Sequence, residues 1–348
     1  MKAIKSVKPG IVNAPQILMQ MMTGFWVSQA IYSVAKVGVA DQLKEGPQSV
    51  AVLAHRLNAH EENLYRVMRA LASLGIFRET EDRVFELTPA AALLGSDSPN
   101  SMRPIALMLG EENYHAWGNL YRAIQSGESP FEETYGMNAY AYFEQHPDAA
   151  GNFNSAMTAL VSNDNAAILE SFDFSQFNTI VDVGGGHGML LSALLKRYST
   201  LRGVLFDLPH VVANAGALLR NHGIEERCRV ESGDFYEAVP AGGDAYILSR
   251  VLHAFSDDHC DQILQSIHAA MPRTGKLLVM ESLLQPGNDP ATAKTKLMDV
   301  NMLVFAPGGR DRTLEEYNHL FGQSGFQLNR VVRTESGIAV LEAIKRTN

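Results

Sequence analysis

The strongest chemical signal in the sequence is a glycine-rich turn after a short apolar strand. Residues 181–188 read Val-Asp-Val-Gly-Gly-Gly-His-Gly, and a helix-like segment follows. Because glycine has no Cβ, such a turn lets a ligand approach the backbone. A nicotinamide dinucleotide fingerprint requires G-x-G-x-x-G/A, but its third position falls on Met189 or Leu191. A phosphate-binding P-loop fails as well, because leucine follows Gly275 and Lys276.

Two aspartates after later strands fit a nucleoside ligand that has no pyrophosphate, and S-adenosylmethionine is such a ligand. Asp207 ends the second predicted strand, where a carboxylate can accept both ribose hydroxyls. Asp234 follows the third strand and can accept from an adenine amino group, with Phe235 available to pack on the ring. The alternative is that both aspartates merely cap the helices that follow.

A histidine and a carboxylate follow the next two strands. O-methylation requires a deprotonated oxygen, and a phenol with a pKa of about 10 is mostly protonated at neutral pH. A positioned base is therefore worth about 100- to 10,000-fold in rate. His253 comes after the fourth strand, and Glu281 at the end of the fifth could orient the imidazole. Taken alone, His253 could equally be a surface histidine at a helix start.

The elements that must position these groups alternate between strands and helices after residue 177. This alternation predicts an α/β fold with a parallel, doubly wound sheet. Residues 331–332 and 338–341 predict a terminal antiparallel hairpin at the sheet edge, and Thr313 with Glu316 forms a capping box. The parallel strands are expected at residues 179–183, 203–206, 228–230, 245–248 and 276–280.

The first hundred residues predict a small, mostly helical domain that ends in a hairpin, which is the outline of a winged helix. Glu61 and Glu62 open the would-be recognition helix and would point carboxylates at DNA, which argues against a DNA-binding regulator. The apolar residues of 24–39 fit a buried dimer surface, although a monomer core would also use them. Helices are expected at residues 50–57 and 63–74, and hairpin strands at 76–79 and 83–87.

The composition restricts the partners and the compartment. The 348 residues carry a formal net charge of -9, which argues against a nucleic-acid partner. Cys228 and Cys260 are the only cysteines, which favours a reducing cytoplasm. Residues 9–35 lack charge and superficially resemble a signal peptide, but polar residues interrupt them. We expect an amphipathic helix there that buries one face, and no membrane insertion.

The chain resembles the family of S-adenosylmethionine-dependent O-methyltransferases that includes plant caffeate-type and bacterial polyketide and phenazine-type enzymes. Residues 64–71 and 87–89 resemble the dimerisation domain of that family. The matching motifs of the C-terminal half are residues 181–188, 206–209, 233–235, 252–257 and 308–313.

The resemblance covers nearly the whole chain and implies two domains. A winged-helix-like dimerisation domain is expected over residues 1–103, and a Rossmann-like methyltransferase domain over residues 104–348. Within the second domain, residues 104–169 are expected to form a helical connector and substrate walls.

The resemblance also implies roles for single residues. His253 is then the general base, with Glu281 and Asp311 beside it. Phe153, Met157 and Met302 match substrate-pocket positions, and their apolar side chains indicate an aromatic or polycyclic acceptor, although core packing is the alternative. The residues expected to bind S-adenosylmethionine, and its product S-adenosylhomocysteine, are Asp182, Gly184, Gly186, Asp207, Leu208, Asp234, Phe235 and Ser249.

Three positions depart from the pattern of the family. Ala254 replaces an aspartate that commonly follows the catalytic histidine, and Asp311 replaces a glutamate of the plant members. Ala306 falls where plant members have a substrate-facing asparagine. A plant-like phenylpropanoid pocket is therefore not expected.

These observations predict a homodimer that methylates a hydroxyl of a small aromatic or enolic natural product. Some members of the family use the fold for hydroxylation, decarboxylation or pericyclic reactions, but the retained His253, Glu281 and Asp311 argue against that alternative. A metal site is not expected, because residues 257–260 are consecutive at a helix start and cannot all converge on one ion. Solvated acids at the helix start are the preferred interpretation of Asp257 and Asp258.

Overall fold

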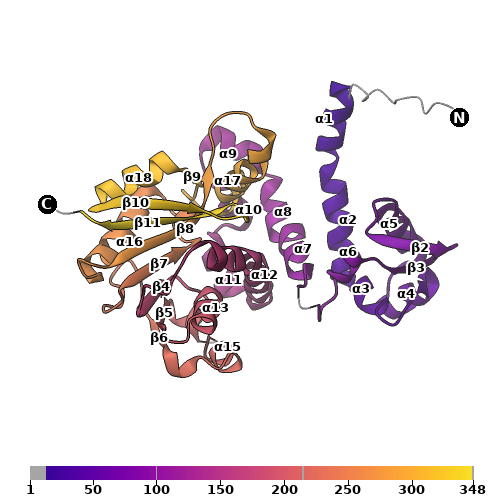
Figure 1. The fold of residues 1–348 in the computed structure, drawn as a ribbon. Coiled ribbons are helices and arrows are strands. Elements are labelled where there is room, and N and C mark those ends of the chain that lie inside the picture. Colours follow the sequence, from indigo (N-terminus) through magenta and orange to yellow (C-terminus); the bar gives the residue numbers. More distant parts are fainter. Residues whose placement is uncertain (1–12, 99, 214, 347–348) are drawn as a thin grey trace, which may run out of the picture. The chain divides into compact units, whose positions relative to one another are not determined.

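The computed structural model describes residues 13–98, 100–213 and 215–346 (Figure 1). The chain forms two compact units, Met1–Glu112 and Asn113–Asn348. Each unit has its own buried core.

The first unit consists of helices and a small antiparallel sheet, as the sequence predicts. Its three strands have the order β1-β3-β2, and its core includes Leu53, Met68 and Phe85. The strands are β1 (Gln48–Ser49), β2 (Phe77–Glu81) and β3 (Val84–Leu87). The helices are α1 (Ala14–Met22), α2 (Gly24–Val37), α3 (Val39–Gln42), α4 (Val50–Leu57), α5 (Glu61–Ser73), α6 (Pro89–Ala92) and α7 (Arg103–Gly110).

The prediction of one amphipathic helix near the N-terminus is wrong in two respects. The segment forms two helices, α1 and α2, which separate at Thr23, and residues 9–12 lie outside the described part of the chain. Helix α1 buries none of its residues within the chain, so its apolar side chains stay exposed. The described part of a single chain therefore does not bury the apolar face of α1.

The second unit begins with a helical region, again as predicted. An aromatic cluster connects this region to α17 (Ala293–Phe305) through Phe131, Phe143, Phe153 and Phe305. The helices are α8 (Glu112–Trp117), α9 (Leu120–Ser126), α10 (Pro130–Tyr135), α11 (Ala139–Gln145) and α12 (Pro147–Ser171).

An eight-stranded sheet organises the remainder of the second unit. Its order is β10-β11-β8-β7-β4-β5-β6, with β9 paired to β8, so the predicted terminal hairpin lies at one edge. Strands β4 to β8 are mutually parallel, and β10 and β11 are antiparallel. The strands are β4 (Thr179–Val183), β5 (Arg202–Asp207), β6 (Cys228–Ser232), β7 (Ala245–Ser249), β8 (Lys276–Leu284), β9 (Arg312–Thr313), β10 (Phe326–Arg333) and β11 (Ile338–Lys345).

Helices cover both faces of this sheet (Figure 1). Val181 and Val183 of β4 pack on the side of α16 and α18, whereas Ile180 packs on the side of α12 and α13. This alternation along one strand is the period of two that positions side chains on opposite faces. The remaining helices are α13 (Met189–Arg197), α14 (Pro209–Val212), α15 (Ala215–Asn221), α16 (Asp257–Ala270) and α18 (Leu314–Gln323), with short turns η1 (Glu225–Arg227), η2 (Leu252–Ala254) and η3 (Pro290–Thr292).

Two further features of the described residues bear on the sequence analysis. None of the helices in the described part of the chain is long and apolar enough to cross a membrane. Cys228 and Cys260 are both buried and free. Burial raises the pKa of the Cys228 thiol to about 11 and that of Cys260 to about 12.

A buried carboxylate holds the edge hairpin to the sheet and generates a prediction about stability. Glu342 of β11 accepts from Asn329 and contacts Lys276 at 3.3 Å and Arg330 at 3.0 Å. Burial disfavours the charged carboxylate, but the Asn329 hydrogen bond and the two cations outweigh it, so the pKa of Glu342 lies below its usual range.

We expect Glu342→Gln to lower the free energy of unfolding at pH 7 by about 1–3 kcal/mol, because it leaves two cations without their buried partner. The pKa of Glu342 is lowered by folding, so its stabilisation is complete above the unfolded pKa and is lost as the pH falls through the folded pKa. Urea unfolding at pH 7 and at successively lower pH should therefore show a shrinking difference between the two proteins. Glu335→Gln, in the exposed turn of the same hairpin, is the control; a difference that grows on acidification would contradict this account.

Candidate active site

The glycine-rich turn lies at the carboxyl end of β4 and leads into α13. Gly186 has a φ of +60°, and a Cβ at this position would meet no protein atom within 4 Å. Glycine is therefore required there by backbone conformation, while the space beside it stays open to a ligand. At Gly185 the reason differs, because a Cβ would lie 2.7 Å from the carboxyl carbon of Asp182.

Asp207 ends β5, as predicted, and its carboxylate is bound to the glycine turn. Its Oδ2 accepts from the Gly186 N–H at 2.8 Å, and its Oδ1 accepts from the Leu208 N–H at 2.7 Å. Burial raises the pKa of Asp207 even though these two hydrogen bonds favour the charged form. The carboxylate thus connects the ends of two neighbouring strands, β4 and β5, at the open edge of the sheet.

Asp182 lies beneath the same turn and is almost completely buried. Its Oδ2 has no hydrogen-bond partner among the described residues. Burial, together with the nearby Asp207, raises the pKa of Asp182 to about 7. A buried carboxylate oxygen without a hydrogen-bond partner is rare in folded proteins and is consistent with a functional role for the turn above it.

The other predicted cofactor residues follow β6 and β7. Asp234 is half-buried and its Oδ1 accepts from the Tyr236 N–H at 2.8 Å, within a turn that leads to β7 and not to a helix, so it does not cap a following helix. Phe235 lies beside the glycine turn, with its Cε1 3.7 Å from the position of a Cβ on Gly184. Ser249 is the last residue of β7 and is half-buried.

His253 lies in η2, directly after β7, and faces two carboxylates. Its Nδ1 is 3.7 Å from Oε2 of Glu281 and 3.4 Å from Oδ1 of Asp311. Its backbone N–H also donates to Oε1 of Glu281 at 3.3 Å. The structure therefore brings together the three residues that the resemblance proposes as a group, although their side chains come from separate segments.

The electrostatics of this group favour a protonated imidazole. Burial lowers the pKa of His253, but the charges of Glu281 and Asp311 outweigh burial, so the net shift is upward. Glu281 is completely buried, which raises its own pKa. Oε2 of Glu281 and both carboxylate oxygens of Asp311 have no hydrogen-bond partner among the described residues.

One detail of the prediction is wrong at Glu281. It does not end its strand, because β8 continues to Leu284 and pairs there with β9. This extension explains how Asp311, immediately before β9, reaches the histidine. The Asp311 N–H donates to Oδ1 of Asp299 on α17 at 2.9 Å, which fixes the backbone at that point.

Comparison with known proteins identifies the family. The model of the O-methyltransferase domain matches residues 117–327, and that of the O-methyltransferase dimerisation domain matches residues 19–97. The chain belongs to the S-adenosylmethionine-dependent O-methyltransferases. It is 43% identical to the phenazine O-methyltransferase PhzM of Lysobacter antibioticus, over 97% of this chain and 98% of that protein.

Solved structures of O-methyltransferases share the fold. A crystal structure of LaPhzM superposes with a TM-score of 0.92 at 43% identity, and covers 96% of this chain and 100% of that one. Human N-acetylserotonin methyltransferase, solved in complex with S-adenosylmethionine, superposes with a TM-score of 0.87 at 28% identity, over 99% of this chain and 100% of that one. The N-terminal unit thus matches a methyltransferase dimerisation domain, which removes the main reason for considering a DNA-binding regulator.

The residues at the carboxyl edge of the sheet fit the cofactor of this O-methyltransferase family. The space beside Gly186 is open, Asp182 has an orphaned oxygen, and Asp207 and Asp234 present carboxylates after consecutive strands. Phe235 offers an aromatic surface beside the turn. These are the groups that a nucleoside with ribose hydroxyls and an adenine ring requires.

The three predicted substrate residues lie on α12 and α17. Phe153 stacks on Phe305 at 5.5 Å and on Phe143 at 4.6 Å between ring centroids. Met302 is buried, and Met157 is half-buried. These contacts are those of a packed aromatic core, so the role of Phe153, Met157 and Met302 as pocket walls stays a prediction.

Sequence reasoning missed an ion pair beside the predicted site. Arg250 follows Ser249, has a φ of +56° and contacts the buried Asp164 of α12. The backbone N–H of Arg250 donates to the carbonyl of Met280 on β8 at 3.0 Å. No local pattern announces a pair between residues so far apart in sequence, although an arginine between Ser249 and Val251 of an apolar segment was a weak signal.

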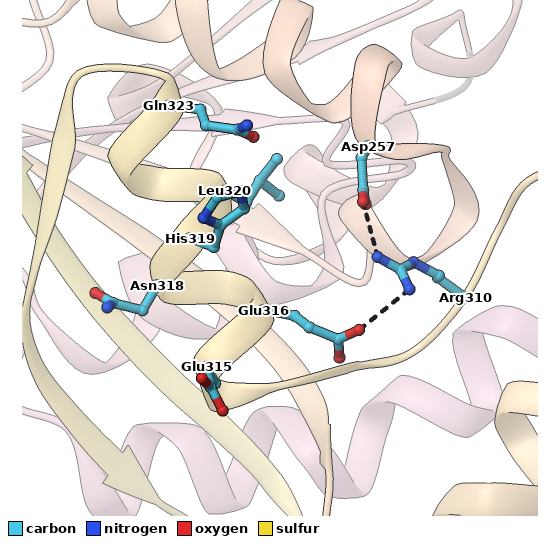
Figure 2. Close-up of a pocket in the computed structure, with 8 residues that line it drawn as sticks. All are labelled: Asp257, Arg310, Glu315, Glu316, Asn318, His319, Leu320 and Gln323. Atoms are coloured by element: carbon cyan, nitrogen blue, oxygen red, sulfur yellow. Dashed lines mark hydrogen bonds and ion pairs between the residues drawn. The ribbon is translucent and has the colours of Figure 1, made fainter.

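Asp257 is exposed in the first turn of α16, as predicted, and it also pairs with two arginines. It binds both Arg310 and Arg312. Figure 2 shows Arg310 between Asp257 and Glu316. These residues line a surface pocket with a volume of about 450 Å³. The pocket is lined by Asp257, Arg310, Glu315, Glu316, Asn318, His319, Leu320 and Gln323, none of which belongs to the glycine turn or to the His253 group.

Within the described ranges, no group of three or more His, Cys, Asp or Glu side chains could hold a metal ion. Cys260, next to the acidic helix start, points into the core, where its Sγ–H donates to the carbonyl of Leu252 at 3.2 Å.

We expect Asp207→Ala to weaken the binding of S-adenosylhomocysteine by about 1–3 kcal/mol, because it removes a charge-assisted acceptor and frees the Gly186 N–H. Calorimetric titration measures this directly, and the acceptor substrate need not be known. Asp173→Ala, at an exposed position before β4, removes the same group and should bind as the unchanged protein does. Equal affinity in Asp207→Ala would show that the ribose site lies elsewhere.

Proposed function

We propose that this O-methyltransferase acts on a hydroxyl of a small aromatic or enolic molecule and that His253 is its general base. The observation that carries the proposal is the position of the His253 imidazole, between two buried carboxylates and directly after a strand that ends at the predicted cofactor edge. A base held by Glu281 and Asp311 needs no metal ion to ionise the acceptor.

The geometry divides the two ring nitrogens of His253 between two tasks. Nδ1 faces Glu281 and Asp311, so it carries the proton that these carboxylates attract. Nε2 is then left as the acceptor for the proton of the substrate hydroxyl. When that proton is taken up, the resulting imidazolium gains the attraction of both carboxylates, which lowers the cost of ionising the acceptor.

The cofactor site would supply the other reactant. S-adenosylmethionine, when bound, provides an electrophilic methyl group on a sulfonium centre. Asp207 and Asp234 would hold its ribose and adenine, and Phe235 would pack on the ring. Asp182, whose Oδ2 is orphaned, would support the turn from below.

The acceptor class follows from the apolar surroundings and from a relative. Phe153, Met157 and Met302 offer flat or flexible apolar contacts, and Ala306 removes the polar contact of plant enzymes. The relative from Lysobacter antibioticus is a phenazine O-methyltransferase, so a fused aromatic acceptor is compatible with a similar chain. Hydroxyphenazines are therefore the first acceptors to test.

We expect His253→Ala to lower turnover at least about 100-fold while S-adenosylhomocysteine binds nearly as before, because a general base contributes that much to proton removal. In the unchanged protein, turnover should rise with pH as His253 loses its proton, and the raised pKa of His253 moves this rise above the range usual for histidine. Mass spectrometry of the product measures the transfer. His259→Ala, at an exposed position on α16, is the control.

Two outcomes would oppose the proposal in different ways. Unchanged turnover in His253→Ala would remove His253 from the mechanism. A product whose mass equals that of its substrate would instead favour the non-methylating alternative.

The exposed apolar face of the N-terminal unit supports a homodimer. Met21 is 73% exposed and Trp26 is 64% exposed, with Leu18, Met22 and Phe25 exposed beside them. An apolar patch of this kind on a dimerisation domain marks a surface that a second copy covers. The buried free thiols agree with the cytoplasmic location that we propose.

We expect Trp26→Glu to convert the dimer to monomers or to raise its dissociation constant at least about 100-fold, because a charge would be buried at the interface. Light scattering after size exclusion, at several protein concentrations, measures the mass. Ile124→Glu, at an even more exposed position of the second unit, is the control and should stay dimeric. A monomeric unchanged protein would contradict the assignment of this surface.

A further inference from the structure

Arg312 is a completely buried arginine next to the His253 turn, and the mechanism above gives it no role. Its Nη1 donates to the carbonyl of Leu252 at 2.9 Å, and its Nη2 donates to the carbonyl of Phe255 at 2.8 Å. These two carbonyls flank His253 on either side. One guanidinium therefore holds both ends of the turn that carries the base.

The turn has few hydrogen bonds of its own. Within η2 and its ends, the Ala254 N–H donates to Val251 at 3.1 Å and the Phe255 N–H donates to Leu252 at 3.3 Å. A 3₁₀ turn has poorer hydrogen-bond geometry than an α-helix, so its position depends on contacts with other segments. Arg312 supplies such contacts.

Arg312 is also linked through the backbone to the segments that carry Glu281 and Asp311. Arg312 directly follows Asp311 in the chain, and it pairs with Leu283 of β8, two residues after Glu281. A displacement of Arg312 would thus change the distance from His253 to Asp311. Arg312 is the point where the turn and the two carboxylate-bearing segments meet.

Asp257 neutralises this buried cation. Its Oδ1 accepts from Nε of Arg312 at 2.9 Å and from Nη2 at 2.7 Å, while its Oδ2 accepts from Arg310 at 2.7 Å. Figure 2 shows the contact between Asp257 and Arg310, and the contact of Arg310 with Glu316. In the described chain, the hydrogen bonds of the Arg310 side chain go to Asp257 and Glu316 and not to the carbonyls of the turn. A substitution of Arg310 therefore removes a nearby positive charge without removing a contact that positions the turn.

We propose that Arg312, neutralised by Asp257, is a positioning residue that holds the His253 imidazole between Glu281 and Asp311. The proposal rests on the role of His253 as base. A planar guanidinium has five donors in a fixed arrangement and can bind two carbonyls and a carboxylate at once. The ammonium group of a lysine cannot reproduce that arrangement, so Arg312→Lys keeps the charge but loses the clamp.

The test compares three variants by measurements that separate position from stability. Arg312→Lys removes the clamp, and Arg310→Met is the matched control. Asp257→Asn removes the neutralising charge and the acceptor for Arg310, but keeps one oxygen that can accept from Arg312. For each variant, an NMR titration of the His253 ring gives its pKa, with His253→Gln used to assign the signal. The charged groups that face His253 are Glu281 on β8, Asp311 before β9 and Arg250 after β7. Turnover, affinity for S-adenosylhomocysteine and melting temperature are measured in parallel.

We expect Arg312→Lys to lower kcat at least about 10-fold, because a displaced base loses alignment with its acceptor. Affinity for S-adenosylhomocysteine should stay within about twofold. The pKa of His253 should fall, because the imidazole moves away from two carboxylates. Asp257→Asn should shift kcat and the pKa in the same direction by a smaller amount, and Arg310→Met should change neither.

Several results would overturn the proposal. A folded Arg312→Lys with unchanged kcat and unchanged His253 pKa would show that Arg312 serves stability alone. A rise of the His253 pKa in Arg312→Lys would show that the positive charge of Arg312, and not its hold on the turn, acts on His253. If Arg312→Lys does not fold, Asp257→Asn decides, and an unchanged pKa in that variant overturns the proposal. The titration needs no acceptor, so it stays informative even if His253→Ala proves active and the base assignment fails.

Discussion

Two carboxylates buried against one imidazole constrain most of the second unit. Glu281 is inaccessible to solvent, and Asp311 is nearly so, which makes each expensive to ionise without a cation beside it. His253 is the nearest group that can become that cation. The length of β8, its pairing with β9 and the turn after β7 all follow from the need to bring these three side chains together. The charge balance of this group therefore depends on the topology of the sheet.

The cofactor edge follows a different logic, since backbone geometry and not charge dominates there. The carboxyl ends of parallel strands lie at one edge of the sheet, so the topology alone places Asp207 and Asp234 at the same edge as the glycine turn. Asp207 then uses its carboxylate to hold Gly186 in place. Backbone hydrogen bonds organise this edge, whereas the His253 group depends on side chains from segments far apart in sequence.

Local pattern explains which features could be predicted from the sequence. Apolar runs between helices defined the parallel strands, and the motifs after them identified Asp207, Asp234 and His253. The clamp of Arg312 and the pair of Arg250 with Asp164 could not be predicted, because each joins residues that only the folded chain brings together. Glu281 was misplaced at a strand end since β9, a two-residue strand, leaves almost no periodic signal. The exposure of α1 could not be predicted, because periodicity shows that a face is apolar but does not show what covers it.

The position of Cys260 has a practical consequence. Its thiol is fully buried, protonated at neutral pH and hydrogen-bonded to Leu252, the residue before His253. An alkylating reagent can reach it only after the chain around that turn opens. Cys228, on the edge strand β6, is buried at the other side of the sheet and provides an internal comparison. The chain thus contains two natural reporters, whose relative labelling rates would distinguish local opening of the turn that carries His253 from opening of the whole sheet.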